Sequence, residues 1–224
     1  MFAPVRNLKN KNSGFTLVEL LVTISIFVIL TGIVVFNQGK FNSTILLTNL
    51  AYDTALNIRE AQTYGVNVKE FNGENKFVPY GVHFSTTDPL YYKSFILFAD
   101  LDYTPATETS DGIYNGPDGN STPDYSKCEI DEGCVSRYNI QRGSYILALC
   151  KGEVLPGEKK CQNDADIITS LNIVFKRPNV DAKMKSDDVS SPEYTVATIV
   201  LSAADGGGFR KVRVASNGLI EIVK

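Results

Sequence analysis

The stretch Ser13-Gly14-Phe15-Thr16-Leu17-Val18-Glu19 opens a predominantly apolar run that continues to Phe36. Counted from Phe15, this run has 22 residues and one charge, the carboxylate of Glu19. A helix of that length rises roughly 33 Å, about the thickness of the hydrocarbon core of a bilayer. A lone carboxylate at that depth costs several kcal/mol. The sequence therefore predicts a membrane helix whose single charge needs a partner.

A short basic leader precedes the apolar run. It contains Arg6, Lys9 and Lys11 and no acidic residue, so the positive-inside rule places it in the cytoplasm and the rest of the chain outside. The whole chain has 22 basic and 25 acidic residues, of which 19 and 24 lie beyond the apolar run. A mildly acidic head of this kind gives no general reason to expect nucleic acid as a partner.

The four cysteines form two close pairs, Cys128 with Cys134 and Cys150 with Cys161. Zinc sites favour two to four intervening residues with further Cys or His nearby, whereas the gaps here are five and ten residues and the only histidine is His83. Disulfides are therefore expected, which agrees with an oxidising compartment outside the cytoplasm. Pairing of sequence neighbours is the simplest of three connectivities, and the sequence leaves the choice open.

Two common kinds of N-terminal segment compete for this run. A secretory signal peptide has a small-residue cleavage site after its apolar core, and no site of the A-x-A type follows here. A plain signal anchor fits the length of the run, but it gives no reason for the charge at Glu19.

The string GFTLVELLVTISIFVIL, which begins at Gly14, resembles the N-terminus of type IV pilins and type II secretion pseudopilins. The resemblance implies that prepilin peptidase cuts between Gly14 and Phe15 and that Phe15 is then N-methylated. It also implies that Glu19 neutralises the N-terminal ammonium of a neighbouring subunit, since opposite charges attract strongly at low dielectric. The implied partners are other pilin subunits, the peptidase and the inner-membrane assembly platform. The implied location is a single-pass inner-membrane precursor that enters an extracytoplasmic filament.

Hydrophobic periodicity indicates how the rest of the chain is organised. We expect a cleaved leader at 1–14, a transmembrane and filament-core helix at 15–37, an amphipathic extension at 38–65 and a β-rich head at 66–224. The extension places Leu47, Leu50 and Ile58 at helical spacing, and Gly65 is a plausible C-cap. Strands are predicted at 77–84, 92–99, 138–140, 145–149, 167–176, 194–203, 211–215 and 219–223. The predicted fold class is α+β and pilin-like, with the long helix packed on an antiparallel head.

Two further segments resemble minor pseudopilins of the H type. They are Ile58-Arg59-Glu60-Ala61-Gln62 and the final hairpin FRKVRVASNGLIEIV, whose turn contains the favoured pair Asn217-Gly218. The resemblance implies a structural minor pilin or pseudopilin subunit. No nucleophile motif or catalytic constellation is visible, so an enzyme is not expected.

An acidic, turn-rich segment from Asp100 to Glu132 has nine carboxylates and one basic residue, Lys127. Oxygen-rich loops suit Ca²⁺, and Asp100, Asp102 and Asp111 are the candidate ligands. The spacing does not match an EF-hand, and a solvated acidic loop is the competing interpretation. Apart from this calcium hypothesis, no cofactor is predicted.

The alternative function is a DNA-uptake minor pilin that binds DNA through its head. Some such relatives have a basic GRxR-type motif at the last hairpin, where this chain has Gly218-Leu219-Ile220-Glu221. Only Arg210, Lys211 and Arg213 on the preceding strand form a small basic group. Nucleic acid is accordingly not the expected partner.

Overall fold

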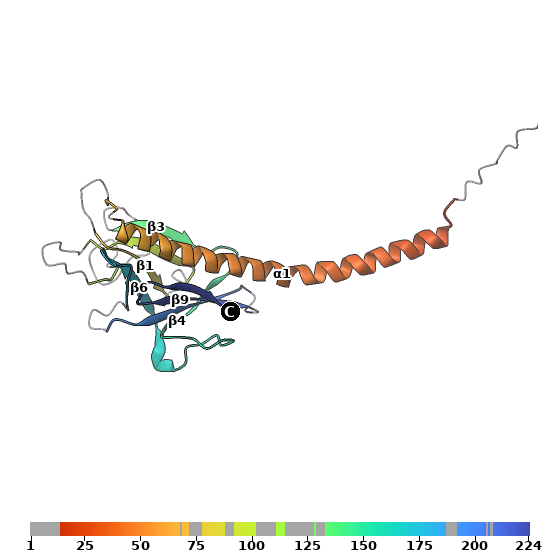
Figure 1. Ribbon diagram of the computed structural model, residues 1–224. Coiled ribbons are helices and arrows are strands. Elements are labelled where there is room, and N and C mark those ends of the chain that lie inside the picture. The colour runs from red at the N-terminus through yellow and green to blue at the C-terminus, as the bar shows by residue number, and fades with distance from the viewer. Residues whose placement is uncertain are drawn as a thin grey trace, which may run out of the picture. The chain divides into compact units, whose positions relative to one another are not determined.

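The computed structural model describes residues 14–67, 69–71, 78–87, 92–101, 111–114, 128, 133–186, 192–204, 206 and 208–224, with only the backbone described at 36–41. One long helix, α1 (Leu17–Val66), comes first (Figure 1). Strands and one short 3₁₀ helix follow it: β1 (Tyr80–Ser85), β2 (Ser94–Ala99), β3 (Cys134–Asn139), β4 (Tyr145–Lys151), η2 (Asp164–Asp166), β5 (Ile167–Ile168), β6 (Ser170–Phe175), β7 (Ala182–Lys185), β8 (Val196–Ser202), β9 (Phe209–Ala215) and β10 (Ile220–Val223).

The chain divides into two compact units, Met1–Phe41 and Asn42–Lys224. Helix α1 belongs to both, because it runs without interruption through the boundary. The domain limits predicted from the sequence concern processing and membrane insertion as well as folding, and they stay predictions.

The part of α1 within the second unit is amphipathic for a simple reason. Leu47, Leu50, Ala51, Ile58 and Ala61 recur at spacings of three, four and seven, and all are buried. Such spacing places these side chains on one helical face. That face packs into the head, so the helix is held by tertiary contacts as well as by its own propensity.

Two antiparallel sheets form the head. The first has the strand order β3-β2-β1-β6-β7, and the second has the order β10-β9-β8-β4-β5. Among the described residues, backbone hydrogen bonds of 2.8 Å connect segments of the two sheets. They run from the Ile146 amide to the Tyr92 carbonyl, from the Ala182 amide to the Ser216 carbonyl and from the Tyr194 amide to the Met184 carbonyl. The α+β, pilin-like architecture predicted from the sequence is confirmed.

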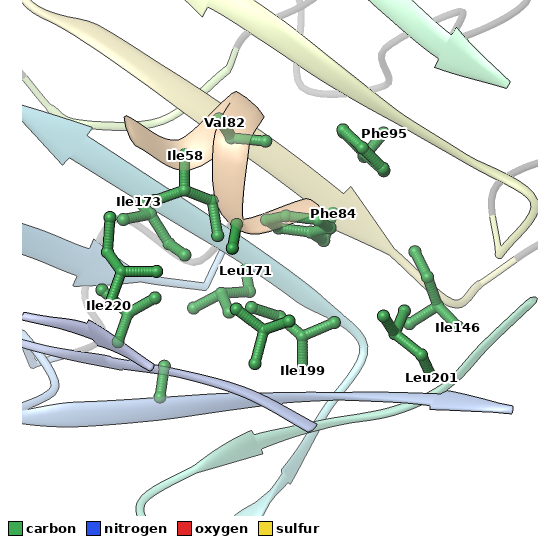
Figure 2. Packing of buried hydrophobic residues seen from close by; sticks show 14 of the residues in the cluster. Ile58, Val82, Phe84, Phe95, Ile146, Leu171, Ile173, Ile199, Leu201 and Ile220 are labelled. Carbon is green, nitrogen blue, oxygen red and sulfur yellow. The ribbon is translucent and has the colours of Figure 1, made fainter. Parts of the chain in front are cut away.

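A single large apolar cluster lies between the sheets and α1 (Figure 2). It joins Ile58 of the helix to Val82 and Ile173 of the first sheet and to Ile199 and Val212 of the second, all of them with 0% exposure. Truncating one such aliphatic side chain to alanine costs about 2–5 kcal/mol. The cluster therefore fixes the head half of α1 against both sheets.

Strand β7 was missed in the sequence, and the first four residues of β3, Cys134–Arg137, were assigned to no strand. Residues 182–185 read Ala-Lys-Met-Lys, with Ala182 and Met184 buried. Only four residues long and half lysine, this segment becomes a strand by pairing with β6. Tertiary pairing outweighs the weak local propensity of such a segment.

Gly65 does not have the capping role predicted for it. It lies within α1, which ends at Val66, and its φ lies outside the left-handed region. A Cβ at this position would lie 2.3 Å from the carbonyl oxygen of Phe175. The glycine instead allows the helix to approach β6 closely.

Only part of the acidic segment falls within the described residues. Ile113 and Tyr114 are buried, and Tyr114 packs with Phe98 and Val174 on the first sheet. The Tyr114 amide donates to Oδ1 of Asn172 at 3.1 Å, and the same oxygen lies 2.7 Å from Nδ1 of the buried His83. His83 is thus a packed histidine of β1.

Candidate processing and assembly site

Gly14 and Phe15 precede the first turn of α1. Both are exposed, Phe15 to 80%, and a Cβ added to Gly14 would meet no atom within 4 Å. Its φ is also outside the left-handed region, so nothing in the fold requires a glycine at this position. Any requirement for glycine there must come from another molecule that recognises it.

Thr16 and Glu19 form the first turn of the helix. The Thr16 carbonyl accepts the amide of Leu20 at 3.1 Å, and Thr16 Oγ1 accepts the amide of Glu19 at 3.3 Å. The Thr16 hydroxyl lies 3.5 Å from Oε2 of Glu19, to which it donates. The bond from the Glu19 amide to Thr16 is the N-cap half of a capping box, and the bond from the Thr16 hydroxyl holds the carboxylate near the positive end of the helix.

The remaining polar side chains of the apolar segment are satisfied within the helix. Thr23, Ser25 and Thr31 each donate to a backbone carbonyl three or four residues earlier, at 2.7–2.8 Å. Back-bonding of this kind lets a hydroxyl lie in an apolar environment without an unpaired donor. Glu19 is thus the one charged side chain of this segment. The hydroxyls of Thr23, Ser25 and Thr31 need no hydrogen-bond partner outside their own helix.

Within the described residues, α1 is the one helix with enough length and apolar character to cross a membrane. The candidate span is Leu17–Val35, 19 residues near the N-terminus, and its apolar side chains are exposed. Length and composition alone would also fit a signal sequence, so the decision rests on the motif around the span.

Residues 9–35 match the family model described as the prokaryotic N-terminal methylation motif. The chain carries a prepilin-type N-terminus. The match includes Gly14, Phe15, Glu19 and the whole candidate membrane span, and it supports a type IV pilin or pseudopilin that is processed by prepilin peptidase. No curated protein and no solved structure matches the chain.

The prepilin motif indicates a structural subunit anchored by one N-terminal apolar helix and assembling with other pilin subunits. It covers 27 of the 224 residues and says nothing about the head. The individual roles of Gly14, Phe15 and Glu19 stay predictions. So do the orientation in the membrane and the assignment to the H type.

Thr16 is a residue of this site that was not predicted from the sequence. Its signal was present, since a threonine three residues before a glutamate at the start of an apolar run is a capping-box pattern. The three hydroxyls in the apolar segment were likewise not recognised as satisfied within the helix.

Two disulfides lie in the head, and both join sequence neighbours. Cys128 pairs with Cys134 and Cys150 with Cys161, with Cα–Cα distances of 5.3 and 5.5 Å. The first connects the acidic segment to the start of β3. The second closes the excursion that follows β4, and Thr198 Oγ1 also holds this excursion by donating to the Gly152 carbonyl at 2.7 Å.

The calcium hypothesis concerns three aspartates, of which Asp102 lies outside the described residues. Asp100 is 2% exposed, and Oδ1 of Asp111 accepts the amide of Ile113 at 2.9 Å. In the described part of the chain, no three His, Cys, Asp or Glu residues are grouped as a metal site would require. Calcium binding stays a hypothesis about the acidic segment.

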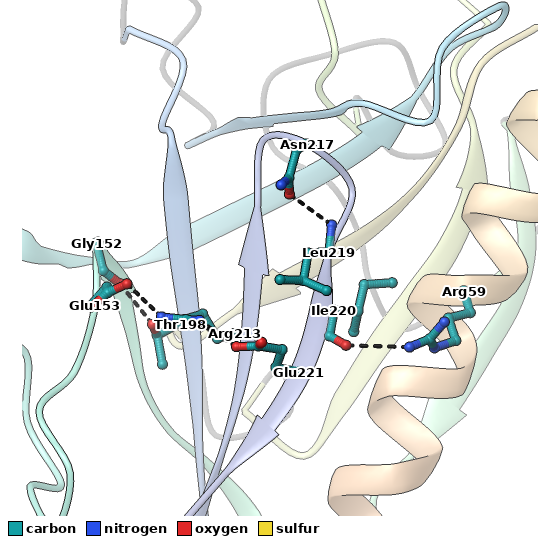
Figure 3. A network of polar contacts seen from close by, with 9 residues as sticks. All are labelled: Arg59, Gly152, Glu153, Thr198, Arg213, Asn217, Leu219, Ile220 and Glu221. Carbon is teal, nitrogen blue, oxygen red and sulfur yellow. Dashed lines mark hydrogen bonds and ion pairs between the residues drawn. The ribbon is translucent and has the colours of Figure 1, made fainter.

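Two of the three basic residues predicted on the penultimate strand are engaged inside the head. Lys211 is fully buried and donates to the Leu155 carbonyl at 2.8 Å. Burial lowers the pKa of its ammonium, and Glu158 offsets part of that shift. Arg213 pairs with Glu153 and Glu221, which flank it on neighbouring segments (Figure 3). This arrangement leaves little unbalanced positive charge on β9.

Proposed function

We propose that this chain is a structural minor pilin or pseudopilin. Prepilin peptidase cuts it between Gly14 and Phe15 and methylates the new N-terminus. The subunit then leaves the inner membrane through the assembly platform and joins a type IV pilus or a type II secretion pseudopilus. The head lies outside the cytoplasm, where its two disulfides persist.

The observation that carries the proposal is the chemistry of the apolar helix. Its hydroxyls are bonded within the helix, and Glu19 remains as its one charge, held by Thr16 at the first turn. An ammonium at the new N-terminus of a neighbouring subunit is the natural partner for this carboxylate. At 4 Å, two such charges attract by about 4 kcal/mol at an effective dielectric constant near 20, which offsets part of the cost of burial.

The proposal that this chain is a minor rather than a major subunit rests on features of the head. The resemblance to H-type subunits involves Arg59, Gln62 and the final hairpin, and these parts contact one another. Arg59 donates to the Ile220 carbonyl at 3.3 Å (Figure 3). Gln62 donates to the Gly218 carbonyl at 3.1 Å. The resembling segments thus form one local structure that joins the helix to the chain's last strands.

The mature N-terminus tests the processing step. We expect mass spectrometry of the cell-expressed protein to find a methylated Phe15 as its first residue. Gly14→Val should leave the leader attached, because the fold tolerates a side chain there and only peptidase recognition is lost. Gly32→Val is the matched control, since a Cβ at Gly32 also meets nothing within 4 Å and lies away from the cut. A wild-type protein with an intact leader, or one cut beyond Phe36, would refute the proposal.

Glu19→Gln tests assembly separately from processing. The amide keeps the size of the side chain and its contact with Thr16, but it cannot neutralise an ammonium. We expect a processed, membrane-bound subunit that no longer enters sheared filaments. Ser25→Ala, which removes a hydroxyl bonded only to its own helix, should assemble normally. Normal filament entry of the Glu19 variant would contradict the assigned role.

The DNA-uptake alternative makes a different prediction. Phosphate contacts are strongest at low salt, so the protein should then retard duplex DNA in a gel and lose that binding as salt rises. Arg210→Ala is the variant that should reduce such a shift. No retardation at low salt would exclude this alternative while leaving the filament proposal intact.

A further inference from the structure

Strand β3 forms one edge of the first sheet. Its neighbour is β2, and the amide of Ile140, directly after β3, donates to the carbonyl of Lys93 at 2.7 Å. Hydrogen-bonding direction alternates along an antiparallel strand, so the backbone groups of Arg137 and Asn139 point away from β2. Within the described residues, no group bonds to this outward side.

Many edge strands direct a charge outward, which discourages pairing with another chain. In β3 the candidate for that role is Arg137, but its Nη2 donates to Oγ of Ser94 on β2 at 3.1 Å. The guanidinium is therefore turned back across its own sheet. The outward side of β3 is left with backbone donors and acceptors that an extended peptide could pair with.

A cavity of about 320 Å³ lies at the C-terminal end of this edge, between α1 and the β3–β4 turn. Leu46 and Leu50 of the helix and Ile140 after β3 supply its apolar lining. Asn139 lines it as well, so the cavity adjoins the outward backbone groups. Its volume falls at the lower end of the range for ligand pockets, enough for one long side chain.

Asp53 and Tyr138 supply the charged and polar end of the cavity. The Tyr138 hydroxyl donates to Oδ2 of Asp53 at 2.6 Å, and its ring stacks on Phe95 at 4.7 Å between centroids. Because the phenol proton is used in this bond, the remaining capacity of both groups is for accepting. The cavity therefore offers an apolar wall that ends in a fixed carboxylate, which complements an amphipathic cation.

We propose that an extended segment of a partner polypeptide adds to the outward edge of β3 at Arg137–Asn139 and inserts one lysine into this cavity. The lysine stem lies along Leu50 and Ile140, and its ammonium binds Asp53. Arg142 is a second charged residue of the lining, and its repulsion disfavours any further base beside the inserted lysine. This surface lies within the second unit, Asn42–Lys224, and does not depend on the membrane span or on processing of the N-terminus.

The peptide acetyl-Thr-Val-Lys-Val-Thr-amide is a suitable probe, titrated by NMR into the full-length protein in detergent micelles. We expect binding with a Kd below ~1 mM. A peptide with methionine in place of lysine should bind roughly tenfold more weakly, since it keeps the stem and loses the charge. A peptide methylated on its backbone nitrogens should not bind, because it cannot pair with the strand edge.

Variants of the protein test both halves of the site. Asn139→Pro removes an outward amide while sparing the ladder to β2, and it should abolish binding. Asp53→Asn should weaken binding of the lysine peptide roughly tenfold and leave the methionine peptide unchanged. Leu56→Ala is the control, since Leu56 is 60% exposed on the same helix and does not line the cavity.

Each part of the proposal has a result that would overturn it. Equal binding of lysine and methionine peptides overturns the assignment of Asp53, and full binding by Asn139→Pro overturns strand addition. No binding of the lysine peptide at several times 1 mM overturns the whole proposal. Should the proline variant have a lowered melting temperature, the backbone-methylated peptide provides the same test on the unaltered protein.

Discussion

The side-chain amide of Gln62 donates to the carbonyl of Gly218 at 3.1 Å and to the carbonyl of Val180 at 3.2 Å. These two carbonyls belong to the β9–β10 turn and to the β6–β7 connection, which come from different sheets. Gly218 has φ +80°, and a Cβ there would lie 2.2 Å from the Val180 oxygen. One helical side chain thus holds two turns that touch only because a glycine lies between them.

Gln62→Ala should lower the free energy of unfolding by about 1–3 kcal/mol. The substitution removes two hydrogen bonds and leaves two carbonyls with fewer partners near the surface. Urea denaturation of the wild type and the variant measures the difference. Thr63→Ala is the control, because the exposed Thr63 hydroxyl bonds only to the Arg59 carbonyl within the helix. Equal loss in both variants would mean that the cross-connection of the turns is unimportant.

Gly65→Ala should also destabilise the protein, by about 1–3 kcal/mol, as overpacking does elsewhere. The new methyl would meet the Phe175 carbonyl, so the helix end or β6 must move. Helix propensity alone would favour alanine by about 1 kcal/mol, which makes the sign of the effect informative. Gly32→Ala has no such neighbour and should not lower the melting temperature. A stabilised Gly65→Ala variant would refute the close-approach argument.

Removing the Cys150–Cys161 disulfide by the double change to alanine should cost about 2–3 kcal/mol. The bridge closes a loop over eleven positions, and closing such a loop constrains the unfolded chain. Thermal unfolding should show a single transition at lower temperature. The same measurement on the wild type under strong reductant should give a midpoint at least as low as that of the variant, because both disulfides are then lost. An unchanged midpoint in both would mean that other contacts hold the excursion fully.

Local patterns in the sequence predicted the parts of this protein that depend on local residues. The apolar run, its single carboxylate and the aromatic and β-branched residues of strands such as β1 and β8 can each be recognised within a short window of sequence. Strand β7 and the first four residues of β3 were not, because Lys183 and Arg137 are poor strand signals. These segments become strands by pairing with β6 and β2.

The two candidate sites also differ in whether neighbouring residues in the sequence identify them. Gly14, Phe15 and Glu19 lie within six consecutive residues, and a linear motif identifies them. The cavity beside β3 requires Asp53 and Tyr138, which are 85 residues apart, to meet. No spacing rule relates two such positions, and only the packed head brings them together.

The Asp53–Tyr138 contact also predicts how stability changes at alkaline pH. Burial, aided by the hydrogen bond to Asp53 and its charge, raises the pKa of Tyr138 from 10.0 to about 12. Between those values the folded protein keeps the phenol proton while the unfolded chain releases it. The stabilisation is thus complete below pH 10 and is lost as the pH rises to about 12.

Tyr138→Phe isolates this effect from that of Tyr80, whose pKa burial also raises to about 12. Below pH 10 the variant should be less stable than the wild type, because it lacks the bond to Asp53. The difference should shrink as the pH approaches 12, since the wild type then loses its own contribution. Tyr52→Phe, at a tyrosine 56% exposed on α1, should show no such change. Denaturant unfolding across this pH range measures the free energy of unfolding of each protein. If the difference between wild type and Tyr138→Phe stays constant up to about pH 12, the folded protein does not hold the Tyr138 proton more tightly than the unfolded chain does.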